Sequence, residues 1–455
     1  MMKQQFLMML IFLTFNASTF AETNANQTSD LQREIEEFYD IQPLPKSSLE
    51  QNLYILGVGL SYPNDDYYEV GRKIAESNYL LGQEMKSKQL ENWDLKQNIR
   101  YVNDYLVGDE ALLRFSHLFS EQNGRKRINV CNRYDDENCI QATITDAEQI
   151  LALNVENEIL QKRYESFPLL VNQSTGYFHP YSFADAAYPD ITSLISLIDL
   201  DAANAVLDLS SGNRDKGIER LERISFLASL PHNGTLTFPL LQLNIQQALN
   251  QTINALLNEQ LLDPNDPFLT QLYREDVNRF DHKIRAALKW QTKAMMQNNL
   301  YLYQDYKAKL LDVVKDEKID LEDEKKVAEF LYQYYKNYEA SLAQENLDPK
   351  VFQQAMPNIE GLPFNIYLAS PYEYLMQAKY QKAYELLLRA KIKVLKGEAL
   401  NADDQVELDT ENSILYIDFD EGLEEGSPLL PQPIRWFNQG RQFLGRLEVA
   451  IPKVK

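Results

Sequence analysis

The sequence predicts a mainly α protein, an irregular array of helical hairpins of solenoid-like or bundle type with a small β appendage at its carboxyl end. Three observations lead to this fold class. Glycine and proline are sparse, at 16 and 18 of 455 residues, which favours helices over β-sandwiches. Apolar residues recur with the helical period through residues 191–262, and strand-like alternation begins only after Gly397.

Residues 191–262 have the clearest helical pattern of the chain. An apolar residue recurs every three or four positions over five turns, from Ile191 to Leu209. Gly212 is suited to the left-handed position that ends this helix, and Pro231 ends the next one. A third helix follows an Asn-Gly turn. Because short turns join antiparallel neighbours, the segment predicts successive helical hairpins.

The amino-terminal residues form a predicted signal peptide. Lys3 supplies the positive charge, residues 6–15 supply the apolar core, and Ala21 is a small residue suited to cleavage. The apolar run is too short for an ordinary membrane span, although an uncleaved anchor in the inner membrane is the alternative. The expected location is therefore the periplasm, with no transmembrane span after cleavage.

The predicted regions are a signal peptide (1–21), a flexible segment (22–45), an N-terminal helical region with a disulfide loop (46–190), a central and C-terminal helical region (191–396) and a β-rich tail (397–455).

Two capping boxes mark helix starts in the region of residues 46–190. Ser47 to Glu50 precedes a helix that is expected to run to Pro63. Thr145 to Glu148 opens a second helix that is expected to run to Pro168. The apolar face expected for that second helix comprises Ile150, Leu153, Val155, Ile159 and Leu160. Further helices are expected over residues 31–39 and 69–86, and short strands within residues 90–142.

The chain has two cysteines, Cys131 and Cys139. In an exported protein, an even number of closely spaced cysteines predicts a disulfide. Closing so short a loop stabilises the fold by roughly 2–3 kcal/mol on the chain-entropy model. A redox site would favour the C-x-x-C spacing, so the expected role of this disulfide is structural.

The carboxyl half is predicted to be helical up to its tail. The longest helix is expected over residues 268–310, a second one ends near residue 343, and a third covers residues 372–396. Alternation of apolar and polar residues predicts a strand over residues 413–419. Further short strands are expected over residues 434–437 and 444–451.

Several segments, in their order along the chain, resemble a broad group of uncharacterised envelope proteins of Gram-negative bacteria. The similar segments are Asn52–Val58 with Gly71 and Arg72, the pair Cys131 and Cys139, Ile159–Tyr164, and the helices that begin at Ile191. They cover roughly residues 50–260. The resemblance implies a mostly helical fold and a periplasmic location, and it carries over no catalytic residue.

The composition and the motifs exclude several kinds of function. The formal net charge is −22, which disfavours nucleic acids and anionic lipid surfaces as partners. The sequence contains no P-loop, G-x-G-x-x-G, G-x-S-x-G or H-E-x-x-H motif. The four histidines are too far apart in sequence for a local metal motif. We therefore predict no catalytic residue, cofactor or metal, and His179, in a loop, is the best single candidate for chemistry.

Tyrosine is enriched, with 27 residues that include two clusters. Together with His179 they form a candidate binding surface that comprises Tyr301, Tyr303, Tyr306, Tyr334, Tyr335 and Tyr338. Such a surface would stack sugars or bind an extended peptide. The alternative is that these rings pack between helices.

The function expected from the sequence is that of a non-enzymatic scaffold of the cell envelope. Its partner would be another envelope protein or a peptide, because helical hairpins present an extended surface and the catalytic motifs are absent. One alternative is an envelope hydrolase that acts on glycan or peptide through carboxylates or His179. The other is a carrier of a small ligand or lipid, which requires a closed apolar cavity between helices.

Overall fold

The computed structural model describes ten parts of the chain: residues 30–39, 52–62, 66–76, 131, 139–171, 177–178, 190–310, 324–344, 371–418 and 446–452. Within these residues the fold is mainly α, with a small three-stranded antiparallel sheet near the carboxyl end. The predicted fold class is thus confirmed. Among the described helices, none combines the length and the apolarity that a membrane span requires.

The three predicted central helices form the middle of the molecule. They are α9 (Ile191–Ser210), α10 (Arg214–Ser229) and α11 (Thr237–Asn258). Gly212 has a φ of 84° and lies in the turn after α9, as the sequence predicts. The segment between α10 and α11 contains β2 (His232–Asn233), which pairs in parallel with β1 (Tyr177–Phe178). The three helices pack against one another and supply nearly half of the buried residues of the largest core cluster.

A four-helix segment precedes these central helices. It consists of α5 (Cys139–Thr145), α6 (Ala147–Glu156), α7 (Glu158–Glu165) and α8 (Phe167–Leu170). The predicted capping box at Thr145 is wrong, because the Thr145 hydroxyl donates to the carbonyl of Gln141 at 2.8 Å and thus closes α5 instead. The predicted single helix is also wrong, because the segment divides into three helices, with breaks at Asn157 and at Ser166.

Two helices near the amino end cross at glycines. The helix α2 (Leu53–Gly59) begins after Asn52, whose side chain accepts from the Tyr54 amide at 2.9 Å. The predicted cap at Ser47 lies outside the described residues. A Cβ atom on Gly59 would lie 2.0 Å from the carbonyl oxygen of Tyr67, in the helix of residues 67–76. Only glycine allows the two backbones to approach so closely.

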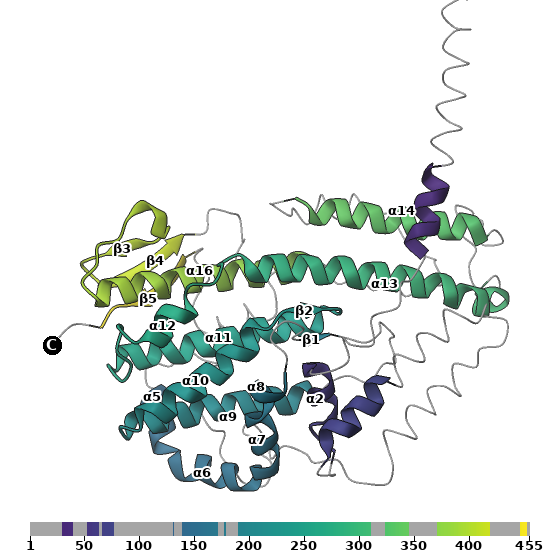
Figure 1. Ribbon diagram of the computed structural model, residues 1–455. Coiled ribbons are helices and arrows are strands. Elements are labelled where there is room, and N and C mark those ends of the chain that lie inside the picture. Colours follow the sequence, from purple (N-terminus) through teal and green to yellow (C-terminus); the bar gives the residue numbers. More distant parts are fainter. Residues whose placement is uncertain are drawn as a thin grey trace, which may run out of the picture.

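The carboxyl half contains α12 (Pro267–Leu272), α13 (Arg279–Leu310), α14 (Glu324–Leu342) and α16 (Pro371–Leu395). The long helix predicted from residue 268 is wrong in one respect, since the chain is not helical between Leu272 and Arg279. The helix of residues 30–39, purple in Figure 1, crosses α14. Its Tyr39 hydroxyl donates to the carbonyl of Ala328 at 3.1 Å, across 289 residues of sequence.

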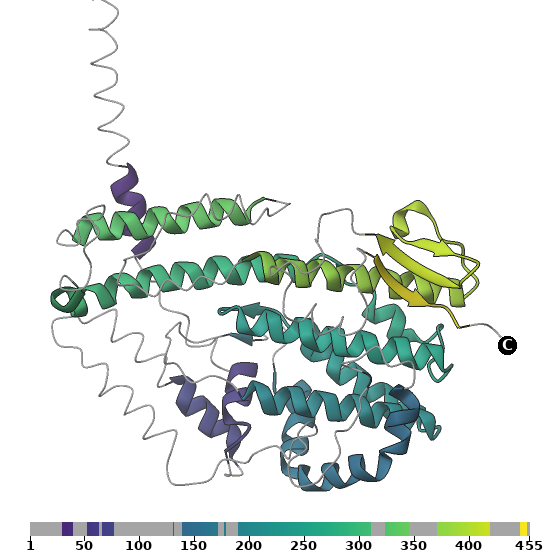
Figure 2. The ribbon, with the colours of Figure 1, turned by 180° about the vertical axis from the view of Figure 1, so that it is seen from behind.

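The β appendage consists of three strands in the order β3–β4–β5, both pairs antiparallel. The strands are β3 (Glu407–Asp409), β4 (Ile414–Asp418) and β5 (Arg446–Ala450). Leu415 pairs with Val449, and both side chains are buried against Leu387 and Leu388 of α16. The predicted strand at residues 434–437 lies outside the described residues. The sheet lies beside one end of α16 (Figure 2) and is therefore part of the packed body.

The helices are stacked in successive layers. The segment α6–α7 lies at one edge, α9 and α10 follow, then α11, and then a long layer made of α13 and α16 (Figure 1). The helix α14 packs on α13 at the opposite edge. Among the described helices and strands, none forms a further layer on the outer side of α6 and α7.

Candidate functional site

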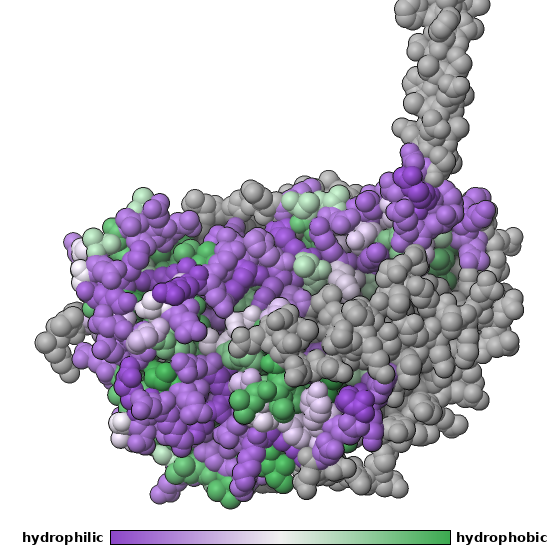
Figure 3. Space-filling view, viewed as in Figure 1, coloured by the Kyte–Doolittle hydropathy of each residue, from purple (hydrophilic) through white to green (hydrophobic). Residues whose placement is uncertain are grey.

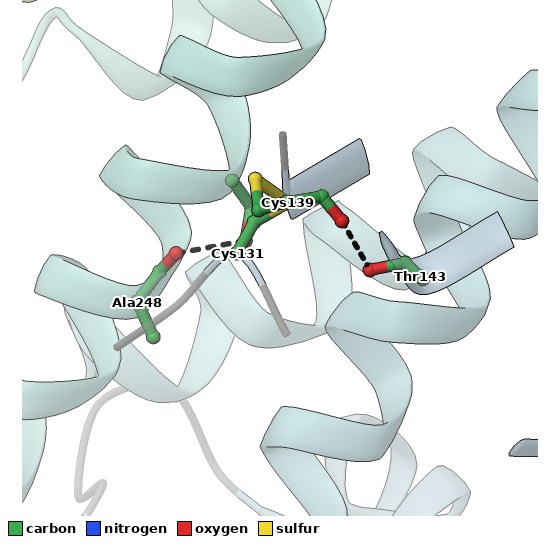
Figure 4. The surroundings of a disulfide bond; sticks show 5 residues. Cys131, Cys139, Thr143 and Ala248 are labelled. Atoms are coloured by element: carbon green, nitrogen blue, oxygen red, sulfur yellow. Dashed lines mark hydrogen bonds between the residues drawn. A yellow bond between two sulfur atoms is a disulfide. The ribbon is translucent and has the colours of Figure 1, made fainter. Parts of the chain in front are cut away.

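The segment α5–α8 begins at the disulfide between Cys131 and Cys139, which the sequence predicts and the structure contains. Both cysteines are buried in the main core cluster. Figure 4 shows the disulfide beside Ala248 of α11 and the hydroxyl of Thr143, which donates to the carbonyl of Cys139 at 2.9 Å. The disulfide therefore holds the first turn of α5 against the central helices.

One side of α6–α8 is part of the core. Ile150, Leu153, Leu160, Tyr164 and Phe167 are all buried, and they pack in the cluster that contains α9. Because these side chains pack in one cluster and both α6 and α7 contact α9, the segment has a defined inner side. Its outer side faces solvent.

The outer side carries a row of exposed hydrophobic side chains, which we call the apolar row. Its members, with their exposed fractions, are Ile144 (37%), Leu151 (58%), Val155 (75%), Ile159 (54%) and Leu169 (87%). One other large hydrophobic side chain among the described residues, Leu408, is comparably exposed. Single exposed hydrophobic residues are normal, but their concentration within one segment makes it a candidate interaction surface. Figure 3 shows hydrophobic residues at the lower edge of the molecule, where α6 lies in Figure 1.

Carboxylates border the apolar row. Glu148, Glu156, Glu158 and Glu165 are exposed, whereas Lys162 is the exposed cation of the same segment within the described residues. The Lys162 ammonium lies 2.6 Å from the Glu158 carboxylate, and this contact lowers the pKa of Glu158 and raises that of Lys162. The border is therefore acidic overall.

Hydrogen bonds fix the shape of the surface beneath the apolar row. The side-chain amides of Asn154 and Asn204 bond to each other in both directions at 2.8 Å, which joins α6 to α9. Gln161 of α7 donates to Asn154 at 2.5 Å. At the bend between α6 and α7, the Asn157 side chain donates to the carbonyl of Leu153 at 2.9 Å. The apolar row thus lies on a fixed backbone.

A buried charge cluster lies deeper, between α7, α9 and α10. The Asp201 carboxylate lies 2.6 Å from Arg220 and 3.4 Å from Arg223, and the Arg223 guanidinium lies over the ring of Tyr164. Burial raises the pKa of Asp201, against the opposing effect of the two arginines. Burial also raises the pKa of Tyr164. Because the acid is matched by two cations, the cluster is suited to holding three helices together.

The predicted tyrosine surface is placed only in part. Tyr334 and Tyr338 are buried, and Tyr335 is half-buried with its ring centroid 4.9 Å from that of Phe38. These three rings take part in helix packing, as the alternative interpretation states. The side chains of Tyr301, Tyr303 and Tyr306, on the last turns of α13, lie outside the described residues, as does His179.

The hydrolase hypothesis requires carboxylates or a histidine that a substrate can reach, and the carrier hypothesis requires a closed apolar cavity between helices. Three buried or nearly buried carboxylates, Asp201, Asp266 and Glu385, each form an ion pair with an arginine. Within the part of the chain that the structure describes, no group of three or more His, Cys, Asp or Glu side chains is placed to hold a metal ion. An apolar pocket of about 10 Å³ lies between α2, α9 and α11, next to Leu53 and Phe238. Such a space holds about one water molecule, not a lipid.

Two lysines lie in the layer between α11, α13 and α16, Lys391 buried and Lys283 half-buried. The Lys391 ammonium donates to the side-chain oxygens of Asn254 and Asn258 at 2.6 and 2.5 Å, and burial lowers its pKa to about 7. Lys283 donates to the Leu230 carbonyl at 3.0 Å, and burial lowers its pKa to about 8. Both lysines contact interior groups, so they are constraints on the fold and not parts of an open site.

The sequence holds a signal for the apolar row, although the predicted apolar helix face combines two of its members with core residues. Val155 and Ile159 are expected in the core, yet they are exposed, whereas Ile150, Leu153 and Leu160 are buried. Residues 144–169 carry apolar side chains on two faces, and one helix in a surface layer can bury only one of them. The second face was the available signal for an interaction surface.

Comparisons of the chain with protein-family models, with curated proteins and with solved structures find no match.

Proposed function

We propose that this protein is a non-enzymatic binding scaffold of the cell envelope, and that the apolar row of α5–α8 is the surface that binds its protein partner. The observation that carries the proposal is the exposure of Leu151, Val155 and Ile159 on a segment whose other side is fixed to the core. Leaving such side chains in water is unfavourable by roughly 25 cal/mol per Å² of apolar surface. A partner that covers them removes this cost.

The proposed location is the periplasm. The apolar segment at residues 6–15 supports it, because such a segment directs export. The disulfide between Cys131 and Cys139 also supports it, because disulfides persist in oxidising compartments. Fractionation of a Gram-negative host that produces the full chain tests this part. We expect the protein in the periplasmic fraction, and recovery from the cytosol or with the inner membrane would contradict the proposal.

Site-specific photocrosslinking tests the binding surface in the cell. A photoreactive benzoylphenylalanine replaces Val155 in one variant and Leu408 in another, since both positions are exposed and hydrophobic but only the first belongs to the apolar row. We expect a discrete crosslinked species from position 155 that position 408 does not give. The triple variant Leu151→Ser, Ile159→Ser, Leu169→Ser, with the probe still at position 155, is expected to lose that species. Equal crosslinking from both positions would refute the proposal.

A further inference from the structure

The apolar row is open to occupants of different chemistry, and the charges around it discriminate between them. Four exposed glutamates border it, against the single exposed Lys162 among the described residues of this segment. The whole chain has a formal charge of −22. A second copy would place one acidic border against another, and an anionic lipid surface would meet the same repulsion. Charge complementarity therefore favours a basic occupant.

The spacing of the row indicates the shape of that occupant. Leu151, Val155 and Ile159 recur every four residues along α6 and the start of α7. Leu151 and Val155 lie on successive turns of α6, and Ile159 extends the surface onto α7 beyond the bend at Asn157. Side chains one turn apart on a helix are the pattern against which the apolar face of another helix packs. An extended strand would instead require unpaired backbone groups at a sheet edge, and this surface is helical.

We propose that the apolar row binds a basic amphipathic helix of a partner protein. Its apolar face lies on Leu151, Val155 and Ile159, and its lysine or arginine side chains reach the carboxylates of Glu148 and Glu156. This inference rests on the proposed function and names the chemistry of the partner. The bend at Asn157 and the amide pair of Asn154 with Asn204 hold the receiving surface in place, so little ordering of this protein is needed on binding.

A defined peptide tests the inference. The probe is a helical peptide of about 14 residues, which is four turns, built from leucine on one face and lysine on the other. Three control peptides keep its length: one has the same composition in an order that abolishes the apolar face, one has glutamate in place of lysine, and one has glutamine there. Fluorescence anisotropy with the purified protein, residues 22–455, measures binding. We expect binding of the lysine peptide and at least tenfold weaker binding of each control.

Matched variants assign the binding to the apolar row. Leu151→Ser with Val155→Ser is expected to abolish binding, whereas Leu408→Ser leaves it unchanged. Neutralising Glu148, Glu156 and Glu158 together as glutamines is expected to weaken binding about tenfold and to reduce its dependence on salt, because exposed ion pairs are lost. Neutralising Glu398, Asp403 and Glu411, which are exposed elsewhere, is the charge-matched control. Far-UV circular dichroism confirms that each variant stays folded.

The outcomes separate this inference from the proposed function. Equal binding of the lysine and glutamate peptides overturns the inference. Self-association that depends on Leu151 and Val155 also overturns it, and so does binding to phosphatidylglycerol vesicles that depends on these two residues. Crosslinking from position 155 in the cell without binding of the lysine peptide also overturns it, while the proposed function stands. Absence of both results refutes the two together.

Discussion

The guanidinium of Arg279, in the first turn of α13, donates to both carboxylate oxygens of Glu385 in α16, at 2.7 and 2.5 Å. Glu385 is buried, with 1% of its side chain exposed, and the two residues are 106 positions apart in sequence. A bidentate contact of this kind fixes the relative position of two helices as well as their distance. It is one of the links that make α13 and α16 a single layer.

Removing one partner of this ion pair is expected to destabilise the protein strongly. Glu385→Gln removes the buried counter-ion of Arg279 and leaves it only the partly exposed carboxylate of Glu275, 2.7 Å from its Nε atom. The expected loss is about 3 kcal/mol in the free energy of unfolding. Urea unfolding followed by circular dichroism measures it. The double variant Arg279→Met with Glu385→Leu is expected to lose less, because no unpaired charge remains. A loss below about 1 kcal/mol for Glu385→Gln would show that the pair is not buried as described.

Lys391 is expected to make stability depend on pH. Its pKa is lowered from 10.5 to about 7 by burial, so between these values the unfolded chain binds a proton that the folded chain lacks. The free energy of unfolding therefore rises with pH across this window. Below pH 7 the folded protein bears the full cost of burying a protonated lysine. From pH 7 to pH 9 the gain attributable to Lys391 is about 2 kcal/mol.

The test compares urea unfolding of Lys391→Met and the wild type at pH 7, 8 and 9. Between pH 7 and pH 9, the free energy of unfolding of the variant is expected to increase by about 2 kcal/mol less than that of the wild type. A smaller increase remains in the variant, because the pKa of Lys283 is lowered to about 8. Lys382→Met, a partly exposed position on the same helix, is the control. Identical pH dependence in Lys391→Met and the wild type would contradict the prediction.

Ile150 and Leu151 are neighbours in α6 with opposite environments. Ile150 is fully buried and Leu151 is 58% exposed. Ile150→Ala is expected to cost about 2–4 kcal/mol, because it removes core contacts and leaves a cavity. Leu151→Ala is expected to change stability by less than about 0.5 kcal/mol. Thermal and urea unfolding of the two variants measure the difference, and similar losses in both would mean that the apolar row is covered by the chain itself.

Gly71→Ala is expected to reverse the usual effect of this substitution. In most helices it stabilises by about 1 kcal/mol, but here the new methyl group would lie 2.0 Å from the carbonyl oxygen of Ile55. The two helices must separate, at an expected cost of about 1–3 kcal/mol. Gly59→Ala is expected to act alike, and the double variant to lose less than the sum, because both remove the same crossing. A stabilised Gly71→Ala protein would contradict this arrangement.

Local signals predicted the helices well wherever one face of a helix met one neighbour. The ends of α9 and α10, with Gly212 and Pro231, followed directly from turn chemistry. Predictions of helix boundaries were wrong where a side chain could form its hydrogen bond with either of two helices. Thr145 could cap a new helix or close the old one, and the sequence does not decide between the two.

The candidate site could be predicted less well, since burial depends on contacts between distant segments. Val155 and Ile159 are five and nine residues after Ile150, which places them on a different side of a helix, and they are exposed because α9 covers the side of Ile150. Gly71 admits the backbone of α2, and no local pattern in the sequence indicates that role. The three-residue strand β3 was missed because its pairing with β4, and not its own pattern, defines it.

The position of the helix of residues 30–39 has a consequence for the order of folding. Its hydrogen bond from Tyr39 reaches Ala328, 289 residues later, and its Phe38 is buried against α14. A helix this short is marginal on its own in water. Because the chain is synthesised with its amino end first, this helix has no docking site on α14 until α14 has also emerged. Phe38 is then exposed throughout that interval, which makes this segment a natural point of contact for a chaperone during biogenesis.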